Sequence, residues 1–103
     1  MSELKFDWRW KDYGLRAVPK RLVRFDNDEP NETIDFIKYY KYDDKEISYS
    51  IGYFYYNEHE RRWELKFVGD RFKEVALEDL RVVWKYLSAA YDVLTEWKQG
   101  ENV

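Results

Sequence analysis

Few side chains in this sequence are of the types that perform covalent, acid–base or metal chemistry. The chain of 103 residues has no cysteine and one histidine, His59, which lies between Glu58 and Glu60 in a segment typical of a hairpin turn. Neighbouring positions of a tight turn do not converge on one ion, so we expect no metal site there. The serines share no predicted element with the histidine, and no glycine-rich phosphate-binding motif is present. We therefore predict no catalytic residue, no metal and no cofactor.

Carboxylates are abundant, with 21 Asp and Glu side chains in the chain. Hydrolysis of a glycosidic bond needs two carboxyl groups, one of them with its pKa raised in a sheltered pocket. The acids here cluster in a loop or alternate with basic residues along strands. A single sheet covered by one helix provides no pocket for such a pair, so we expect that the protein is not an enzyme.

Basic and aromatic side chains are interleaved along the predicted strands. The positions expected on the sheet face opposite the helix are Lys5, Arg9, Tyr39, Phe54, Tyr56, Arg62 and Lys66. Proteins that bind single-stranded nucleic acids use such a face, because cations contact phosphates and aromatic rings stack on bases. Basic stems that merely cover half-exposed tyrosines would produce the same pattern. The net charge of −3 also disfavours a nucleic-acid partner, since dedicated binders are usually basic.

Charge is segregated along the first third of the chain. Residues 1–25 carry a net charge of +4, whereas residues 26–35 carry −5 and contain no basic residue. A dipolar surface of this kind guides encounters with charged partners. The candidate acidic interaction loop consists of Asp26, Asp28, Glu29, Glu32 and Asp35. One hypothesis is that it occupies a basic nucleic-acid groove on a protein target. The alternative is that these charges are simply solvated at the surface.

The function that the composition favours is non-catalytic protein binding. Tyr, Trp and Arg dominate the energetics of protein interfaces, and the chain contains ten Tyr and five Trp. A small acidic inhibitor or adaptor, of an immunity or anti-defence type encoded by a phage or mobile element, fits this size and charge. Single-stranded nucleic-acid binding is the alternative. The sequence shows no apolar run suited to a membrane and no start typical of a signal peptide, so we expect a cytoplasmic protein.

The hydrophobic pattern predicts the elements that would position these residues. Apolar and polar residues alternate over most of the chain, which is typical of half-buried strands, and the period then changes to that of a helix. We predict an α+β fold in one domain: an antiparallel meander of about five strands with a long C-terminal helix packed across one face. The expected strands are 4–10, 21–26, 33–42, 47–56 and 61–68, and Gly14 and Pro19 predict a loop after the first. The helix is expected at 76–99, ended by Gly100.

The predicted helix is apolar over about twice the arc that one sheet normally covers. Its main stripe consists of Leu80, Val83, Trp84, Leu87, Ala90, Tyr91 and Leu94, and we expect all of these but Ala90 to complete the core. On the sheet, the expected core is Phe6, Trp8, Ile34, Phe36, Tyr49, Ile51, Tyr53, Trp63, Leu65 and Phe67. A second stripe would join two copies in a homodimer through the C-terminal helix, and consists of Val82, Tyr86, Ala89, Val93 and Trp97. The alternative is a curved sheet that, with the N-terminal segment, covers the whole arc.

Overall fold

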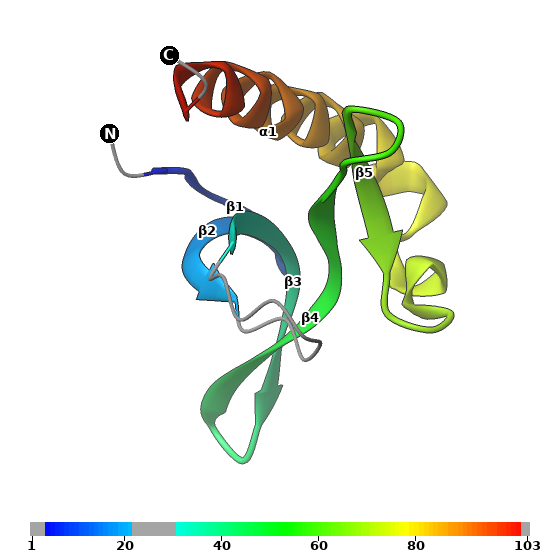
Figure 1. Ribbon diagram of the computed structural model, residues 1–103. Coiled ribbons are helices and arrows are strands. Elements are labelled where there is room, and N and C mark those ends of the chain that lie inside the picture. Colours follow the sequence, from blue (N-terminus) through cyan, green and yellow to red (C-terminus); the bar gives the residue numbers. More distant parts are fainter. Residues whose placement is uncertain (1–3, 22–30, 102–103) are drawn as a thin grey trace.

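The computed structural model describes residues 4–21 and 31–101 and shows a five-stranded antiparallel sheet with one long C-terminal helix (Figure 1). The sheet order is β1-β2-β3-β4-β5, so each strand pairs with its neighbour in the sequence. The predicted α+β meander is therefore confirmed. The elements are β1 (Asp7–Trp10), β2 (Tyr13–Arg21), β3 (Asn31–Tyr42), β4 (Lys45–Asn57), β5 (Arg62–Phe67), the short 3-10 helices η1 (Arg71–Glu74) and η2 (Leu77–Asp79), and α1 (Leu80–Glu101).

Tight turns explain why neighbouring strands pair. Asp43 and Asp44 join β3 to β4, and both adopt a positive φ, of 52° and 61°. Two left-handed residues form the hairpin turn whose twist matches that of the strands, and aspartate tolerates this conformation. Lys11, with φ of 53°, is the first of the two residues that join β1 to β2.

The predicted second strand is wrong in position. It is expected at residues 21–26, whereas β2 spans Tyr13–Arg21, and residues 22–26 lie outside the described part of the chain. Gly14 and Pro19 therefore lie within a strand rather than in a loop. Gly14 has a packing role: a Cβ there would come within 2.8 Å of the Tyr39 ring.

A bulge in β4 changes which side chains face the helix. The register between β3 and β4 shifts between Phe36 and Ile37, where Ile51 is the extra residue. Beyond this point the alternation is reversed, so Phe54 is buried in the core, whereas Tyr53 and Tyr55 turn to the opposite face. The expectations that Phe54 lies on the outer face and Tyr53 in the core are therefore wrong.

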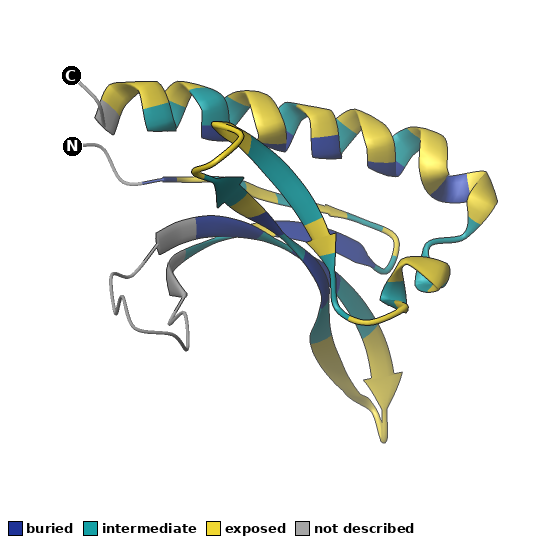
Figure 2. Cartoon of the chain, turned by 45° about the vertical axis from the view of Figure 1, so that its right-hand side comes forward, coloured by how far each residue is buried: buried dark blue, intermediate teal, exposed yellow. Residues whose placement is uncertain are grey.

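The core lies between α1 and the inner face of the sheet (Figure 2). Its buried side chains are Leu4, Tyr13, Leu15, Ile34, Phe36, Ile51, Phe54, Val83, Leu87, Ala90 and Leu94. Leu80, Trp84 and Tyr91 of the predicted main stripe are exposed instead. The helix is rotated about its axis relative to the prediction, because the sheet and the N-terminal segment cover the other flank.

Both ends of the helix also differ from the prediction. The α-helix begins at Leu80 rather than at residue 76, and the preceding residues form the 3-10 turn η2. Gly100 lies within α1, which continues to Glu101, so this glycine does not end the helix.

The β3–β4 hairpin extends beyond the region covered by α1 (Figures 1 and 2). All residues from Tyr40 to Ser48 are exposed. This ribbon lacks a covering layer, so its tip contributes little to the core.

Candidate protein-binding surface

Large apolar side chains gather on one exposed side of the helix and of the turns that precede it. We call this surface the apolar flank and define it by Phe72, Leu77, Leu80, Trp84 and Tyr91. Leu77 is 85% exposed and Trp84 is 66% exposed, which is unusual for side chains of this type. Residues 77, 80, 84 and 91 recur at spacings of three, four and seven, so they share one side of the helical surface.

An apolar groove lies beside this flank, between the start of α1, the end of β5 and the turn that contains η1. Its volume is about 370 Å³. Phe67 and Phe72 meet edge to face in its wall, with ring centroids 6.0 Å apart. Apart from Lys73, its lining is apolar and consists of Phe36, Phe67, Phe72, Val75, Leu77, Leu80, Val83 and Leu87.

Hydrogen bonds to the sheet hold the η1 wall of the groove in place. Tyr49 Oη donates to a Glu74 carboxylate oxygen at 2.7 Å, and Lys38 Nζ donates to the Glu74 carbonyl oxygen at 2.6 Å. Arg71 donates to the Ser50 carbonyl oxygen at 2.6 Å. Burial, together with the bond to Glu74, raises the pKa of Tyr49 to about 12. The hydroxyl is protonated at neutral pH and donates to Glu74, and this bond favours a preformed groove.

A buried carboxylate fixes the start of α1. Asp79 accepts hydrogen bonds from Lys11 Nζ at 2.8 Å and from Tyr13 Oη at 3.1 Å. The Tyr13 oxygen in turn accepts the Ala76 N–H at 3.0 Å. The bond from Lys11 holds the pKa of Asp79 below its ordinary value. Sequence reasoning missed this site, because the residues that form it lie 66 and 68 positions apart.

The predicted nucleic-acid face is only partly assembled on the outer side of the sheet. Arg9 lies 3.9 Å from the centre of the Tyr39 ring, but its guanidinium is paired with the Glu46 carboxylate at 2.7 and 2.5 Å. Lys5 is exposed. Tyr56 faces the helix side, where its ring meets Trp63 edge to face at 5.3 Å, so it does not belong to the outer face.

Strand β5 supplies the remaining basic residues of that face. Arg62 pairs with Glu64 at 3.1 Å, and Lys66 Nζ lies 4.1 Å above the Tyr55 ring. The aromatic residues that the bulge places on this outer face are thus Tyr53 and Tyr55. Tyr39 lies on the same face but nearer the tip of the β3–β4 hairpin, opposite Ser48. A sequence search could have found them only by recognising the bulge.

Only part of the predicted acidic loop lies among the described residues. Asp26, Asp28 and Glu29 lie outside the described residues, whereas Glu32 and Asp35 belong to strand β3. Asp35 lies opposite Arg16 of β2 and Tyr53 of β4. These last two acids are therefore part of the sheet rather than of a loop.

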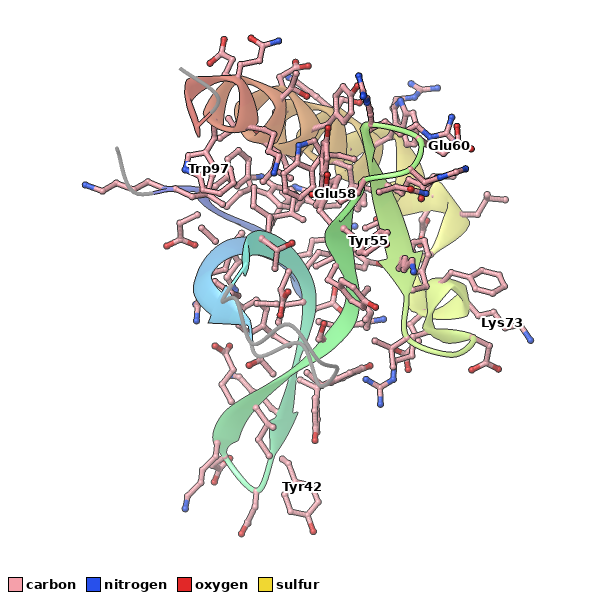
Figure 3. All side chains as sticks on the ribbon, viewed as in Figure 1. Tyr42, Tyr55, Glu58, Glu60, Lys73 and Trp97 are labelled. Atoms are coloured by element: carbon pink, nitrogen blue, oxygen red, sulfur yellow. The ribbon has the colours of Figure 1, made fainter. Side chains whose placement is uncertain are left out.

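The helix flank predicted to join two copies packs against the chain itself. Tyr86 stacks on Trp8 of β1, with ring centroids 4.3 Å apart. Val93 and Trp97 also pack against the core, and Figure 3 shows Trp97 on the side of α1 toward the N-terminal segment. Val82 and Ala89 are half-buried. The sheet and the segment before β1 cover this flank, so the exposed apolar surface is the apolar flank on the other side of the helix.

The described residues provide no group of three His, Asp or Glu side chains that could hold a metal ion. His59 is exposed in the β4–β5 turn, where its N–H donates to the Asn57 side-chain oxygen at 3.0 Å. In the same part of the chain, no helix is long and apolar enough to span a membrane. Comparison with known protein families, curated protein sequences and solved structures gives no match.

Proposed function

We propose that this chain is a non-catalytic protein-binding domain that uses the apolar flank and its groove. The observation that carries the proposal is the exposure of Leu77, which lines an apolar groove, and of Trp84 on the same side of the helical surface. Contiguous exposed apolar surface of this kind typically marks an interaction site. A small acidic inhibitor or adaptor is the form of activity that suits a chain with net charge −3.

The chemistry of the flank supports a protein partner. Trp and Tyr are frequent hot spots of protein interfaces, because each buries a large area with little loss of side-chain freedom. The groove is lined almost entirely by apolar side chains, so its best occupant is an apolar side chain or segment of a partner. Protein partners in this proposal include a second copy of the chain.

The proposal can be tested by comparing three immobilised proteins: the wild type, a Leu77→Ser/Trp84→Ser variant and a Tyr42→Ser control. Tyr42 is also exposed, but lies at the far tip of the ribbon (Figure 3). We expect proteins bound by the wild type and the control to be lost with the double variant. The binding should then be reproduced with purified components. A double variant that retains every partner and remains folded would contradict the proposal.

Single-stranded nucleic-acid binding is the second candidate, supported by the three tyrosines on the outer face and by Lys66 beside Tyr55. It ranks second because Arg9 and Arg62 are paired with carboxylates. The test is a titration of labelled single-stranded DNA and RNA at low and physiological salt, read by anisotropy. Binding that weakens with salt and with Tyr55→Ala, but not with Tyr42→Ala, would support it. Absence of binding at both salt concentrations would exclude it.

A further inference from the structure

Strand β5 lies at one end of the sheet order and pairs only with β4 among the described residues. An edge strand presents backbone N–H and C=O groups that can pair with another chain. The Val68 N–H donates to the Ile51 carbonyl oxygen at 3.1 Å. The backbone groups of Val68, and of every second residue before it in β5, therefore point toward β4. In an antiparallel ladder alternate residues bond to the partner strand. The backbone groups of Trp63, Leu65 and Phe67 are therefore directed toward the open edge.

The apolar flank lies on the same side of the molecule as this open edge. Phe67 of β5 lines the groove together with Leu80 and Leu87 of α1. The opposite side of the helix faces β1, as the stack of Tyr86 on Trp8 shows. An occupant that adds a strand to β5 would thus also cover the exposed side of α1.

We propose that this occupant is a second copy of the chain, whose β5 pairs antiparallel with β5 about a two-fold axis at Leu65. This inference rests on the proposed function and names its partner. Leu65 then lies opposite its own counterpart, and Trp63 lies opposite Phe67 of the second copy. These are the residues whose backbone groups are directed outward, so the ladder can form without disturbing β4. On the outer face, Glu64 lies opposite Lys66 of the second copy, which would join Arg62 and Asn57 as partners of that carboxylate. This arrangement occurs twice by symmetry.

The charges of β5 favour this register over its neighbour. Directly opposite side chains interact most strongly, and like charges there are destabilising. An axis at Glu64 would place Glu64 against Glu64 and Arg62 against Lys66. An axis at Leu65 replaces both repulsive pairs by the attraction between Glu64 and Lys66. An axis at Trp63 would also oppose unlike charges, Arg62 against Glu64, but it would pair only residues 62–64 of β5, whereas the axis at Leu65 pairs residues 63–67. The charges and the length of β5 together therefore favour a second copy paired about Leu65.

The charges of α1 agree with the same symmetry. A two-fold axis perpendicular to the sheet sets both helices on one face, running in opposite directions, with the apolar flanks turned toward each other. The exposed bases Arg81 and Lys85 lie in the first half of α1, and the exposed acids Asp92 and Glu96 lie in the second half. These four residues lie on the arc of α1 that faces away from the sheet, so the opposite charges of the two helices attract across the dimer without direct contact.

The first experiment measures mass by sedimentation velocity over a range of protein concentrations. We expect the wild type and the Tyr42→Ala control to sediment as a species of twice 12.8 kDa. Trp84→Glu should raise the dissociation constant roughly tenfold or more, because interface tryptophans are frequent hot spots. Circular dichroism verifies that the variant is folded. A wild type that stays monomeric at several hundred micromolar, on the order of the weakest stable dimers, would overturn the inference.

The second experiment tests the proposed β5–β5 register by disulfide cross-linking. The chain has no cysteine, so the introduced cysteines are the only ones that can react. Glu64→Cys and Lys66→Cys variants are prepared separately and then mixed under mild oxidation. Opposed residues in an antiparallel pair are close enough for a disulfide. We expect the mixture to form a disulfide-linked dimer several-fold faster than either variant alone. Equal rates in all three samples would overturn the proposed pairing even if the protein is dimeric.

The two experiments separate this inference from the proposed function. A monomeric wild type that still loses a heterologous partner with Leu77→Ser/Trp84→Ser would refute the second copy and support protein binding. A dimer cross-linked between positions 64 and 66 would support both. A monomer that loses no partner with the double variant would refute both.

Discussion

Asp79 is the one charged side chain that is buried among the described residues, at 7% exposure. A buried charge is costly unless it is paired and hydrogen-bonded. Lys11 and Tyr13 satisfy this carboxylate, and through it they connect the β1–β2 turn to the residue that precedes α1. One side chain therefore fixes where the helix starts, although nothing in its local sequence indicates that role.

We predict that Asp79→Asn lowers the midpoint of thermal unfolding at neutral pH by on the order of 5 °C. The folded-state pKa of Asp79 lies below its ordinary value of 3.8, so its stabilising effect is present above that pH. The effect is lost as the pH falls through the folded-state pKa. The difference between wild type and variant, measured by circular dichroism melts, should therefore shrink below about pH 4. A difference that is constant down to pH 2 would contradict this assignment.

The pKa of Lys11 is raised above its ordinary value of 10.5, mainly by its bond to Asp79. Its contribution is fully present below that pH and declines as the pH rises through the folded-state value. The advantage of the wild type over Asp79→Asn should accordingly also decrease in strongly alkaline solution.

Two glycines allow a matched comparison of the same substitution. A Cβ at Gly52 would lie 2.8 Å from the Lys66 carbonyl oxygen, a backbone atom that cannot move without disturbing the β4–β5 ladder. We predict that Gly52→Ala costs roughly 1–3 kcal/mol in the free energy of unfolding. At Gly100, a Cβ would meet no atom within 4 Å, and the residue lies in α1. Gly100→Ala should leave stability unchanged or raise it by up to about 1 kcal/mol. Chemical denaturation of both variants and of the wild type measures the two changes in the free energy of unfolding.

At the scale of elements, α1 packs on the sheet and the N-terminal segment, while its remaining surface is exposed to solvent. Val83, Leu87, Ala90 and Leu94 are buried, and their spacing of three and four residues defines the stripe that faces the sheet. The hydrophobic pattern of the helix is compatible with several rotations about its axis, because its apolar arc is wide. The curvature of the sheet and the segment before β1 select the rotation that is observed.

This rotation predicts different costs for two leucines of the same helix. Leu94→Ala should lower the free energy of unfolding by about 2–5 kcal/mol, because Leu94 is fully buried and its removal leaves a cavity. Leu80→Ala should cost less than about 1 kcal/mol in the monomer, because Leu80 is 44% exposed. Urea unfolding in dilute solution measures both. Similar costs at the two positions would show that the helix is rotated differently.

At the scale of the whole molecule, the proposed dimer would link stability to concentration. The interface forms only when two copies associate, so a higher protein concentration favours the folded dimer over the unfolded chain by mass action. We predict that a tenfold dilution of the wild type lowers its unfolding midpoint by on the order of a few degrees. The Trp84→Glu variant should show a smaller dependence over the same concentrations, because its dimer is weaker. A concentration-independent midpoint in the wild type would count against the dimer.

Much of the fold follows directly from the sequence. Alternation along residues 33–42, 47–56 and 61–68, with aspartates or asparagine between them, determines a three-stranded meander, because period and turn chemistry are local properties. The switch to a helical period near residue 76 determines the C-terminal helix for the same reason. The absence of cysteine and the single histidine likewise limit the available chemistry through composition alone.

Only the tertiary structure decided which faces are covered. The bulge at Ile51 reversed the alternation in β4, so Phe54 is in the core and Tyr55 on the outer face. The contact of Tyr86 with Trp8 covered the flank expected to join two copies, and left Trp84 exposed instead. Both outcomes depend on residues that are distant in the chain. A periodic pattern in the sequence shows which side chains are apolar. Which residues they contact depends on the register of the strands and on the rotation of the helix about its axis, and only the packed molecule determines these.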